Sequence, residues 1–301
     1  MPYTSTSLFI GLTLGCTESP SQLNSASDST TKTEVNTAKP QKVIDDESET
    51  AGSSPKKNTQ KEEIKPKKRV VDSAGLIELK ESFGKEGADQ PSVVPYYHQQ
   101  GREATFQKIN TLIGAANHGP RTFLRADVYD IMTKVFEELK SEPHIYVYGE
   151  GGWGGEFASK RLIPHKTHSK GRHLDIFMPV LEGTQPVYFP TTEANLFGYK
   201  ANFSAKGKGQ GEHKNLGVDW PGLQSLIVKL CTHGGTKLRR ILIAQDMFSF
   251  VTTSANFRKE LEKIPKTCQK KITPIGPIGP YRFAGYKMMV DHDDHIHVEF
   301  K

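Results

Sequence analysis

Residues 164–177, PHKTHSKGRHLDIF, decide how the folded part of this chain must be arranged. The segment carries His165, His168 and His173, and it ends in an apolar run that is typical of a β-strand. One carboxylate, Asp175, interrupts that apolar run. A lone carboxylate is costly to bury unless it is paired or coordinates a metal. Asp175 therefore indicates a paired or metal-bound carboxylate inside the fold.

The final residues, 291–301, read DHDDHIHVEFK and form a second histidine-rich segment. Six of the 11 histidines in the chain lie in these two segments, and the second contributes His292, His295 and His297. A single histidine is more often a satisfied or solvent-facing side chain, but a shared group of His and Asp residues is the inventory of a zinc site. Because side chains alternate along a strand, His295 and His297 share one face, where one can bind metal while the other faces a substrate.

The spacing within the first segment predicts a sharp turn. His168 and Asp175 would lie about 10.5 Å apart along a helix and roughly 23 Å apart along a strand. Bonds from zinc to its ligands are only about 2.0–2.2 Å long. The chain must therefore fold back if both residues bind one metal, and Gly171 stands where a turn can do this.

The motifs resemble those of a known enzyme group. HSKGRHLD fits H-x-x-G-x-x-x-D, which with a distant H-x-H is the signature of the metallopeptidases that unite lysostaphin-type enzymes, D-Ala-D-Ala carboxypeptidases and the hedgehog fold. The chain is most similar to penicillin-insensitive murein endopeptidases, because PHKTHSKGRHLD and HDDHIH match that family's P/G-H-x-x-H-x-x-G-x-x-x-D and H-D-x-H-x-H in the same order. YVYGEGG also resembles the family's GD...GG segment, and the resemblance covers about residues 95–301. His173 stands where the family usually has a smaller or acidic residue.

The resemblance implies one catalytic zinc ion per chain. Its ligands would be His168, Asp175 and His297, with water in the fourth position. His292 would act as the base and His295 would stabilise the oxyanion, although these two roles could be exchanged.

Further residues of the two motifs are expected near the metal. His165 would contact the ligands or the substrate, or it would be an exposed loop histidine. Asp291, Asp293 and Asp294 would orient the imidazoles, or some of them would be ordinary turn acids. Trp153 is expected at the rim of the site, either against the substrate or behind the ligands.

The implied substrate is the D-alanyl to meso-diaminopimelate cross-link of peptidoglycan. Two alternatives use the same zinc scaffold: a D,D- or L,D-carboxypeptidase, which needs a basic pocket for a free carboxylate, and a non-catalytic wall-binding module, which is expected to lack the base. No acyl-serine forms in the zinc mechanism, so β-lactams should not inhibit the enzyme. We expect no nucleic-acid partner.

A glycine-rich stretch raises one different hypothesis. GEGGWG at 149–154 matches G-x-G-x-x-G after a predicted strand, with Asp175 about 20 residues later, as in dinucleotide-binding proteins. That fingerprint must open a long helix, but only EFASKRLI separates the glycines from Pro164. We therefore expect no nucleotide cofactor and interpret the stretch as a flexible loop beside the site.

The N-terminus predicts export. SLFIGLTLGC is an uncharged apolar run that ends at Cys16 and resembles a bacterial lipoprotein signal, although no Lys or Arg precedes it. The run is too short to span a bilayer. We expect residues 1–16 to be this signal and the protein to be periplasmic, anchored to the outer membrane through a lipid on Cys16.

A polar tether is predicted to follow the signal. No aromatic residue occurs between Phe9 and Phe83, and the intervening Ser, Thr, Lys, Glu, Asn and Pro cannot bury enough apolar surface to offset chain entropy. We therefore expect a disordered linker over 17–70 and a metallopeptidase domain over 71–301. The net charge of +6 lies mostly in that domain and suits an anionic polymer or an ordinary solvated surface.

The domain is expected to be α+β, with a small, mostly antiparallel sheet, flanking helices and a single zinc site. Apolar spacing predicts helices in 126–142, in 220–235 with Gly234 and Gly235 closing the helix, and in a segment started by Ser254. Strands are predicted in 144–150, 173–180, 238–244 and 295–300. Cys231 and Cys268 are either a disulfide or two buried thiols.

Overall fold

The computed structural model describes residues 69–165, 167–276, 278–283, 286–290 and 293–301. The predicted signal and nearly all of the predicted linker lie outside these residues, as do Asp291 and His292. Among the described residues, no helix combines the length and the apolar character needed to cross a membrane.

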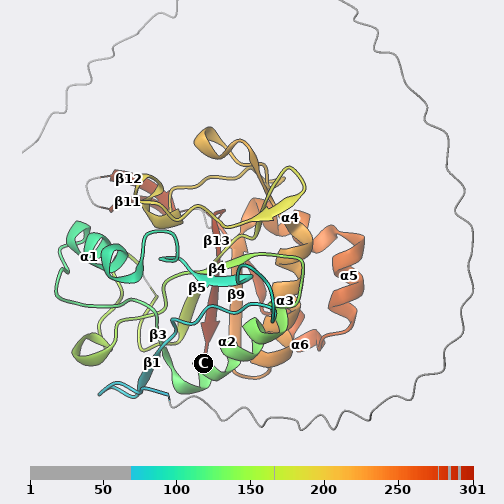
Figure 1. The fold of residues 1–301 in the computed structure, drawn as a ribbon. Helices are drawn as coiled ribbons and strands as arrows, with labels where there is room; N and C mark the ends of the chain where they lie inside the picture. The colour runs from blue at the N-terminus through green and yellow to red at the C-terminus, as the bar shows by residue number, and fades with distance from the viewer. Residues whose placement is uncertain (1–68, 166, 277, 284–285, 291–292) are drawn as a thin grey trace, which may run out of the picture. The chain divides into compact units, whose positions relative to one another are not determined.

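A six-stranded sheet forms the centre of the described domain (Figure 1). Its inner pairings are antiparallel, whereas the pairings at its two edges are parallel. The α+β prediction is confirmed, and the sheet is mostly antiparallel with one parallel pairing at each edge. In spatial order the strands are β10 (Ile272–Ile275), β9 (Leu238–Ala244), β13 (His295–Phe300), β5 (His173–Phe177), β4 (Tyr146–Tyr148) and β2 (Val93–Pro95).

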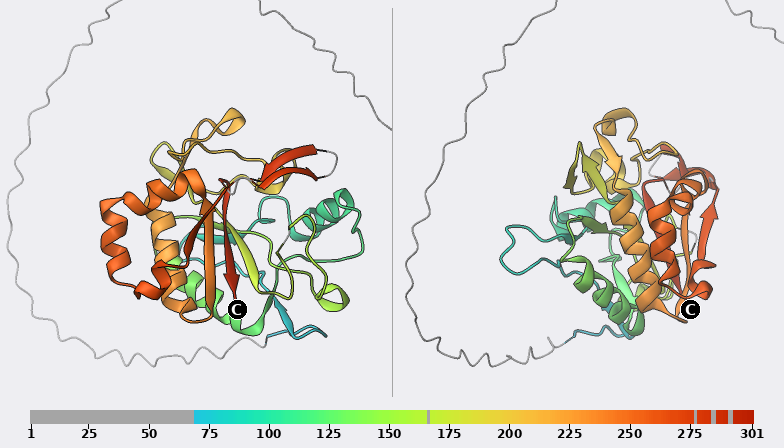
Figure 2. Two further views of the ribbon diagram at one scale, coloured as in Figure 1. Left: turned by 180° about the vertical axis from the view of Figure 1, so that it is seen from behind. Right: turned by 90° about the vertical axis from the view of Figure 1, so that its right-hand side faces the viewer.

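Helices α2 (Ala126–Leu139) and α3 (Trp220–Gly234) pack against each other beside the sheet, and α3 contacts β9 (Figures 1 and 2). The predicted helix boundaries are confirmed where the sequence supplies a cap. Gly235 ends α3 with a φ of 43°, and the Ser254 side chain accepts a hydrogen bond from the backbone N–H of Phe257 at the start of α5 (Ala255–Glu262).

Smaller elements surround this core. A three-stranded sheet, a two-stranded sheet and a hairpin lie outside the main sheet. The remaining elements are α1 (Arg102–Leu112), α4 (Gln245–Thr253), α6 (Lys266–Gln269), β1 (Leu76–Glu78), β3 (Phe123–Arg125), β6 (Val180–Glu182), β7 (Gln185–Val187), β8 (Leu216–Val218), β11 (Ile278–Phe283) and β12 (Tyr286–Val290), with 3₁₀ turns η1 (Gly155–Phe157), η2 (Glu193–Gly198) and η3 (Gly211–His213).

The glycine-rich stretch 149–154 does not open a crossover helix. It leads into the single turn η1, whereas a dinucleotide-binding fingerprint opens a long helix. Its packing leaves little freedom, however, because a Cβ at Gly154 would lie 2.5 Å from the Phe123 ring and one at Gly151 would lie 2.9 Å from Leu124. The expectation of a flexible loop is therefore wrong, since close packing against β3 fixes the loop.

Strands β5 and β13 divide their side chains between two faces. Leu174 pairs with Val298 and Ile176 pairs with Ile296, and all four side chains are buried in the main hydrophobic core. Apart from Phe177, which pairs with His295, the alternate residues are polar: Asp175 pairs with His297, and His173 pairs with Glu299. Because side chains alternate along a strand, this register gathers the titratable groups on one face of the sheet.

The two domain cysteines form a disulfide between α3 and α6. Cys231 and Cys268 are separated by 37 residues, and their Cα atoms lie 5.7 Å apart. The disulfide alternative of the sequence prediction is thus confirmed, and free thiols are excluded. Closing a loop of this length removes conformational entropy from the unfolded chain.

Replacing both cysteines by alanine should therefore lower the free energy of unfolding by about 3–4 kcal/mol. Urea unfolding of the oxidised wild type and of the double variant measures this difference. Reductant should destabilise the wild type but leave the variant unchanged. Equal stability of the two oxidised proteins would contradict the prediction.

A second stabilising contact is sensitive to pH. His144 Nδ1 lies 2.7 Å from Asp219 Oδ2, while Asp219 Oδ1 caps α3 by accepting from Gly222 N at 3.1 Å. The hydrogen bond to Asp219 raises the pKa of His144 above its ordinary value of 6.5. A histidine with a raised pKa in the folded state stabilises the fold fully below 6.5, and that stabilisation is lost as pH rises through the raised pKa.

His144→Gln should accordingly lower the free energy of unfolding by about 1–2 kcal/mol at pH 5.5, because a charge-assisted hydrogen bond is lost. The difference from wild type should be smaller at pH 9, where the wild-type imidazole is closer to neutral. Urea unfolding at both pH values measures it. A difference that does not change with pH would mean that the pair contributes no charge-dependent stability.

Candidate metal centre

The predicted turn between His168 and Asp175 is present. Lys170 and Gly171 have φ values of 56° and 61°, so the chain reverses direction just before β5. No side chain fits at Gly171, because a Cβ there would lie 2.4 Å from the backbone N of Arg125. The reversal brings His168 Nε2 to 3.0 Å from Asp175 Oδ1.

His297 completes a triangle of ligand atoms. Its Nδ1 lies 2.8 Å from His168 Nε2 and 2.8 Å from Asp175 Oδ1. All three residues are buried, with at most 3% of their surface exposed. Ligand atoms on a tetrahedral zinc lie roughly 3.3–3.6 Å apart, so these atoms need to separate by only about 0.5 Å to hold the ion. The predicted ligands therefore converge on one point and fit a metal.

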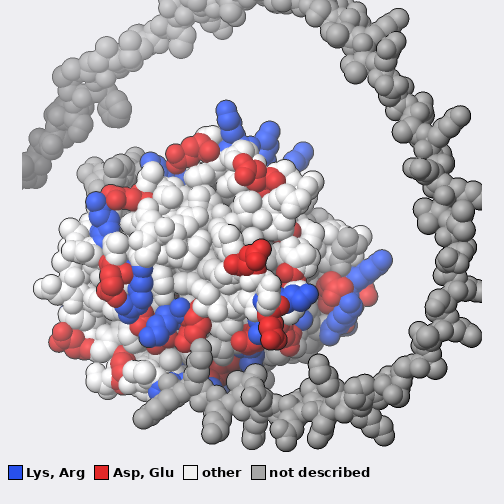
Figure 3. Space-filling model, in the orientation of Figure 1, with Lys and Arg blue, Asp and Glu red and all other residues white. Residues whose placement is uncertain are grey.

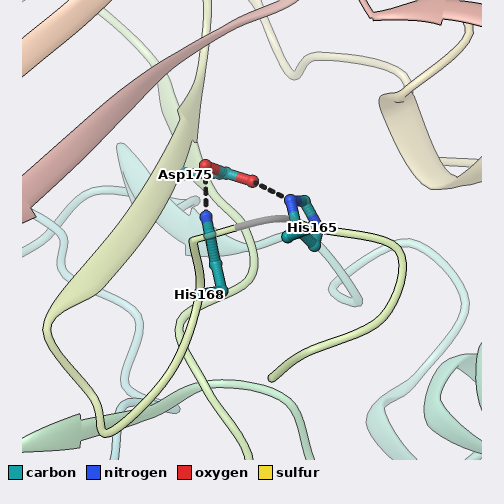
Figure 4. A group of neighbouring side chains, drawn as sticks. All are labelled: His165, His168 and Asp175. Carbon is teal, nitrogen blue, oxygen red and sulfur yellow. Dashed lines mark hydrogen bonds and ion pairs between the residues drawn. The ribbon is translucent and has the colours of Figure 1, made fainter.

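Figure 4 shows a competing set of ligands, in which a nitrogen of His165 and a nitrogen of His168 each contact a different oxygen of Asp175. These three residues also form a group that could hold a metal ion. His165 Nδ1 is 3.5 Å from Asp175 Oδ2, and Tyr199 already donates a hydrogen bond to that oxygen at 3.0 Å. We therefore favour His297 over His165 as the third ligand, because its contacts to the other two ligand atoms are shorter.

The contacts around the ligands set their protonation. His168 Nδ1 lies 3.0 Å from the carbonyl oxygen of Gly151, which can only accept, so Nδ1 carries the proton and Nε2 presents its lone pair. Tyr199 holds one oxygen of Asp175 and leaves the other for the centre. A histidine that binds metal usually donates its other N–H to a carbonyl or carboxylate oxygen, as His168 does to the carbonyl of Gly151.

Electrostatics favour the metal-binding forms of His168 and Asp175. Burial lowers the pKa of His168 to about 3, so its imidazole is neutral. Burial opposes ionisation of Asp175, but His168, His295 and His165 hold its pKa well below the usual range. Burial also opposes protonation of His297, yet contacts with Asp175 and Glu299 raise its pKa. A metal would therefore compete with a proton on His297, and its affinity should fall at low pH.

His295 and Asp294 form a carboxylate–imidazole pair beside the triangle. His295 Nδ1 donates to Asp294, and His295 Nε2 lies 3.7 Å from Asp175 Oδ1. Burial opposes protonation, but Asp175 and Asp294 raise the pKa of His295 to about 9. Asp294 thus contacts an imidazole from the position expected of a carboxylate that orients it. Asp293 instead accepts a hydrogen bond from the backbone N of Phe203 at 2.8 Å and thereby anchors a loop.

A second carboxylate–imidazole pair lies on the other side of Asp175. His165 Nε2 is 2.5 Å from Glu150 Oε2, and Glu150 forms an ion pair with the fully buried Arg121. Burial opposes ionisation of Glu150, but Arg121 and His165 lower its pKa to about 2. His165 is partly exposed, and its contact with Asp175 places it beside the candidate ligands.

Trp153 does not lie at the rim of the site. Only 1% of its surface is exposed, and its ring packs with Ala115 and Leu162. The guanidinium carbon of Arg121 lies 4.7 Å from the indole centroid. The rim expectation is therefore wrong, because Trp153 is buried against Arg121, which pairs with Glu150 beside the centre.

Sequence reasoning missed four residues that contact the expected site. The position of Glu299 could have been predicted from the sequence. Side chains two residues apart on a strand share a face, so Glu299 lies on the same face as His295 and His297. Glu150 carried a weaker signal, since it is a charged residue two positions after a buried strand. Arg121 and Tyr199 carried none, because nothing in their own segments indicates their partners.

No protein-family model matches the sequence, and no curated protein is similar to it. Motif spacing and the geometry of the described residues are therefore the only support for a function.

Proposed function

We propose that this chain is a zinc-dependent endopeptidase that hydrolyses the D-alanyl to meso-diaminopimelate cross-links of peptidoglycan. One observation carries the proposal: His168, Asp175 and His297, from two motifs in the order of the murein endopeptidases, place three ligand atoms within 3.0 Å of one another. A bound zinc ion would activate water and polarise the scissile carbonyl.

The surrounding residues would perform the remaining chemistry. His295 is oriented by Asp294 and can donate a hydrogen bond to the carbonyl oxygen as negative charge develops there. His292 would exchange protons with the attacking water and the leaving amine, or the two histidines would exchange roles. His165 is oriented by Glu150 and would position the substrate.

The same residues favour an endopeptidase over the two alternatives. A wall-binding module has no use for an imidazole held by a carboxylate beside the metal, as His295 is. A carboxypeptidase needs a cation for the free carboxylate of its substrate, and Arg121 does not supply it, because it is fully buried and paired with Glu150. On the face drawn in Figure 3, basic and acidic side chains are interspersed. The described residues on that face therefore form no basic patch that would attract an anionic polymer.

Digestion of purified muropeptides, combined with metal analysis, tests the proposal. The purified protein should contain zinc and convert cross-linked dimers into monomers, and a chelator but not penicillin should stop the reaction. Release of D-alanine from uncross-linked monomers alone would favour the carboxypeptidase. Zinc without any hydrolysis would favour the binding module, and absence of zinc would refute all three.

We further propose that the protein is a periplasmic lipoprotein of the outer membrane. The disulfide suits an oxidising compartment. Wild-type protein should fractionate with membranes, whereas Cys16→Ser should be soluble or unprocessed, as fractionation and mass spectrometry can measure. Equal solubility of both proteins would refute the lipid anchor without affecting the enzymatic proposal.

A further inference from the structure

We infer that Glu299 and Arg240, here called the support pair, hold the imidazole of His297 in the orientation that a metal needs. The inference rests on the proposed zinc centre and extends it to residues outside the two motifs. Glu299 lies two residues after His297 on the same face of β13, and it is fully buried. Arg240 lies on β9, where it pairs with Glu299 in the antiparallel register.

His297 has different neighbours at its two nitrogens. Nδ1 faces His168 and Asp175. Among the described residues, Nε2 faces Thr167 Oγ1 at 3.2 Å, His173 Nδ1 at 3.3 Å and Glu299 Oε1 at 3.5 Å. Glu299 is the one carboxylate among them, and its Oε1 lies at the outer limit of hydrogen-bond distance, so a small shift lets it accept a charge-assisted hydrogen bond from Nε2–H. With the proton on Nε2, the lone pair of Nδ1 is directed at the metal position.

His173, His297 and Glu299 also satisfy the composition of a second metal site. The contacts of Glu299 argue against that use. Arg240 donates to both of its oxygens, from Nε to Oε2 and from Nη2 to Oε1, each at 2.7 Å. Arg239 adds a further positive charge 3.5 Å from Oε2. A metal ion there would have to share the carboxylate with two guanidinium groups, so this cluster supports one metal site and does not form another.

Arg240 has its own part in this arrangement. It locks the Glu299 carboxylate by two parallel hydrogen bonds, so the acceptor that faces His297 is fixed in position. A carboxylate behind a metal-binding histidine fixes the ring and its tautomer and raises the basicity of the ligand nitrogen. The pairing also balances the charge of Glu299, which is otherwise buried among histidines.

Zinc affinity of the full-length protein, measured by competition with a chromophoric chelator and without peptidoglycan, tests the inference. Glu299→Gln should weaken zinc binding about 10- to 100-fold, because the charged acceptor for His297 is lost. Arg240→Met is the matched comparison: it removes the same ion pair but leaves the carboxylate free to accept from His297, so zinc affinity should fall by less than in Glu299→Gln. The wild type should bind one zinc ion.

A third variant guards against misfolding. Glu299→Gln combined with Arg240→Met removes both charges together and leaves neither uncompensated, and it should bind zinc as weakly as Glu299→Gln alone. Wild-type affinity in both variants that lack Glu299 overturns the inference, as do equal losses in Glu299→Gln and Arg240→Met. Two zinc ions in the wild type and one in Glu299→Gln would identify a second metal site instead. A wild type that binds zinc but cleaves no muropeptide refutes the proposed function alone, and one that binds no zinc refutes both.

Discussion

Replacing His168, Asp175 or His297 by alanine should abolish zinc binding and with it all hydrolysis of cross-linked muropeptides. Each residue supplies one corner of a triangle whose sides are 2.8–3.0 Å, and a centre with three protein ligands has none to spare. Zinc content after gel filtration, measured by mass spectrometry, should fall from one ion per chain to none. Activity should not return at zinc concentrations that saturate the wild type.

Two controls make this result specific. His213→Ala removes another buried histidine, which lies in η3, and should leave zinc content unchanged. His165→Ala separates the two possible ligand sets, because His165 should be dispensable for zinc if His297 is the third ligand. Loss of zinc in His165→Ala with retention in His297→Ala would reverse that assignment. Stoichiometric zinc in His168→Ala, Asp175→Ala and His297→Ala would show that the triangle does not bind the metal.

His295→Ala should keep zinc and the fold while kcat on dimeric muropeptides falls about 10²- to 10⁴-fold. That range covers both roles open to this residue, because general acid–base help is worth about 10²- to 10⁴-fold and one oxyanion partner about 10²- to 10³-fold. His295 is not a member of the ligand triangle, and its Nε2 stays 3.7 Å from Asp175 Oδ1. Zinc content and steady-state kinetics on the same preparation separate catalysis from binding.

The pH profile distinguishes the two roles of His295. Loss of a base should remove the acid limb of the profile, whereas loss of an oxyanion stabiliser should lower the whole curve and leave its shape. Asp294→Asn should cause a smaller loss than His295→Ala, because the imidazole remains but loses its charged partner. Wild-type kcat in zinc-loaded His295→Ala would leave catalysis to His292, which the parallel variant His292→Ala tests.

Much of the local structure could be predicted from the sequence because the signals are local. Apolar spacing indicated α2, capping chemistry indicated the end of α3 and the start of α5, and alternation indicated β5 and β13. Gly171 predicted the reversal that joins His168 to Asp175, since few other residues adopt a positive φ readily. The paired motifs then brought together three ligand residues that the fold places in contact.

The same reasoning was wrong where packing opposes a local pattern. The glycines of 149–154 suggested a flexible loop, but their lack of side chains serves the close approach of β3. Trp153 suggested an exposed rim, but it covers the guanidinium of Arg121. The sequence does not distinguish a glycine in a flexible loop from one in a closely packed loop, or an exposed aromatic residue from a buried one. Only the segment that packs against the residue decides between them.

By itself, then, the sequence determined the main helices and strands, the turn at Gly171 and the set of candidate metal ligands, because periodicity, φ preference and motif spacing act within one segment. Only the tertiary structure decided which groups support those ligands. Glu150 contacts Arg121, which is 29 residues away in the sequence, and Glu299 contacts Arg240, which is 59 residues away. The first pair forms because β4 leads into the loop that hydrogen-bonds to the backbone of Arg121. The second forms because β13 lies next to β9 in the sheet. Strand order and register arise from burial of the whole core, so no single segment encodes them.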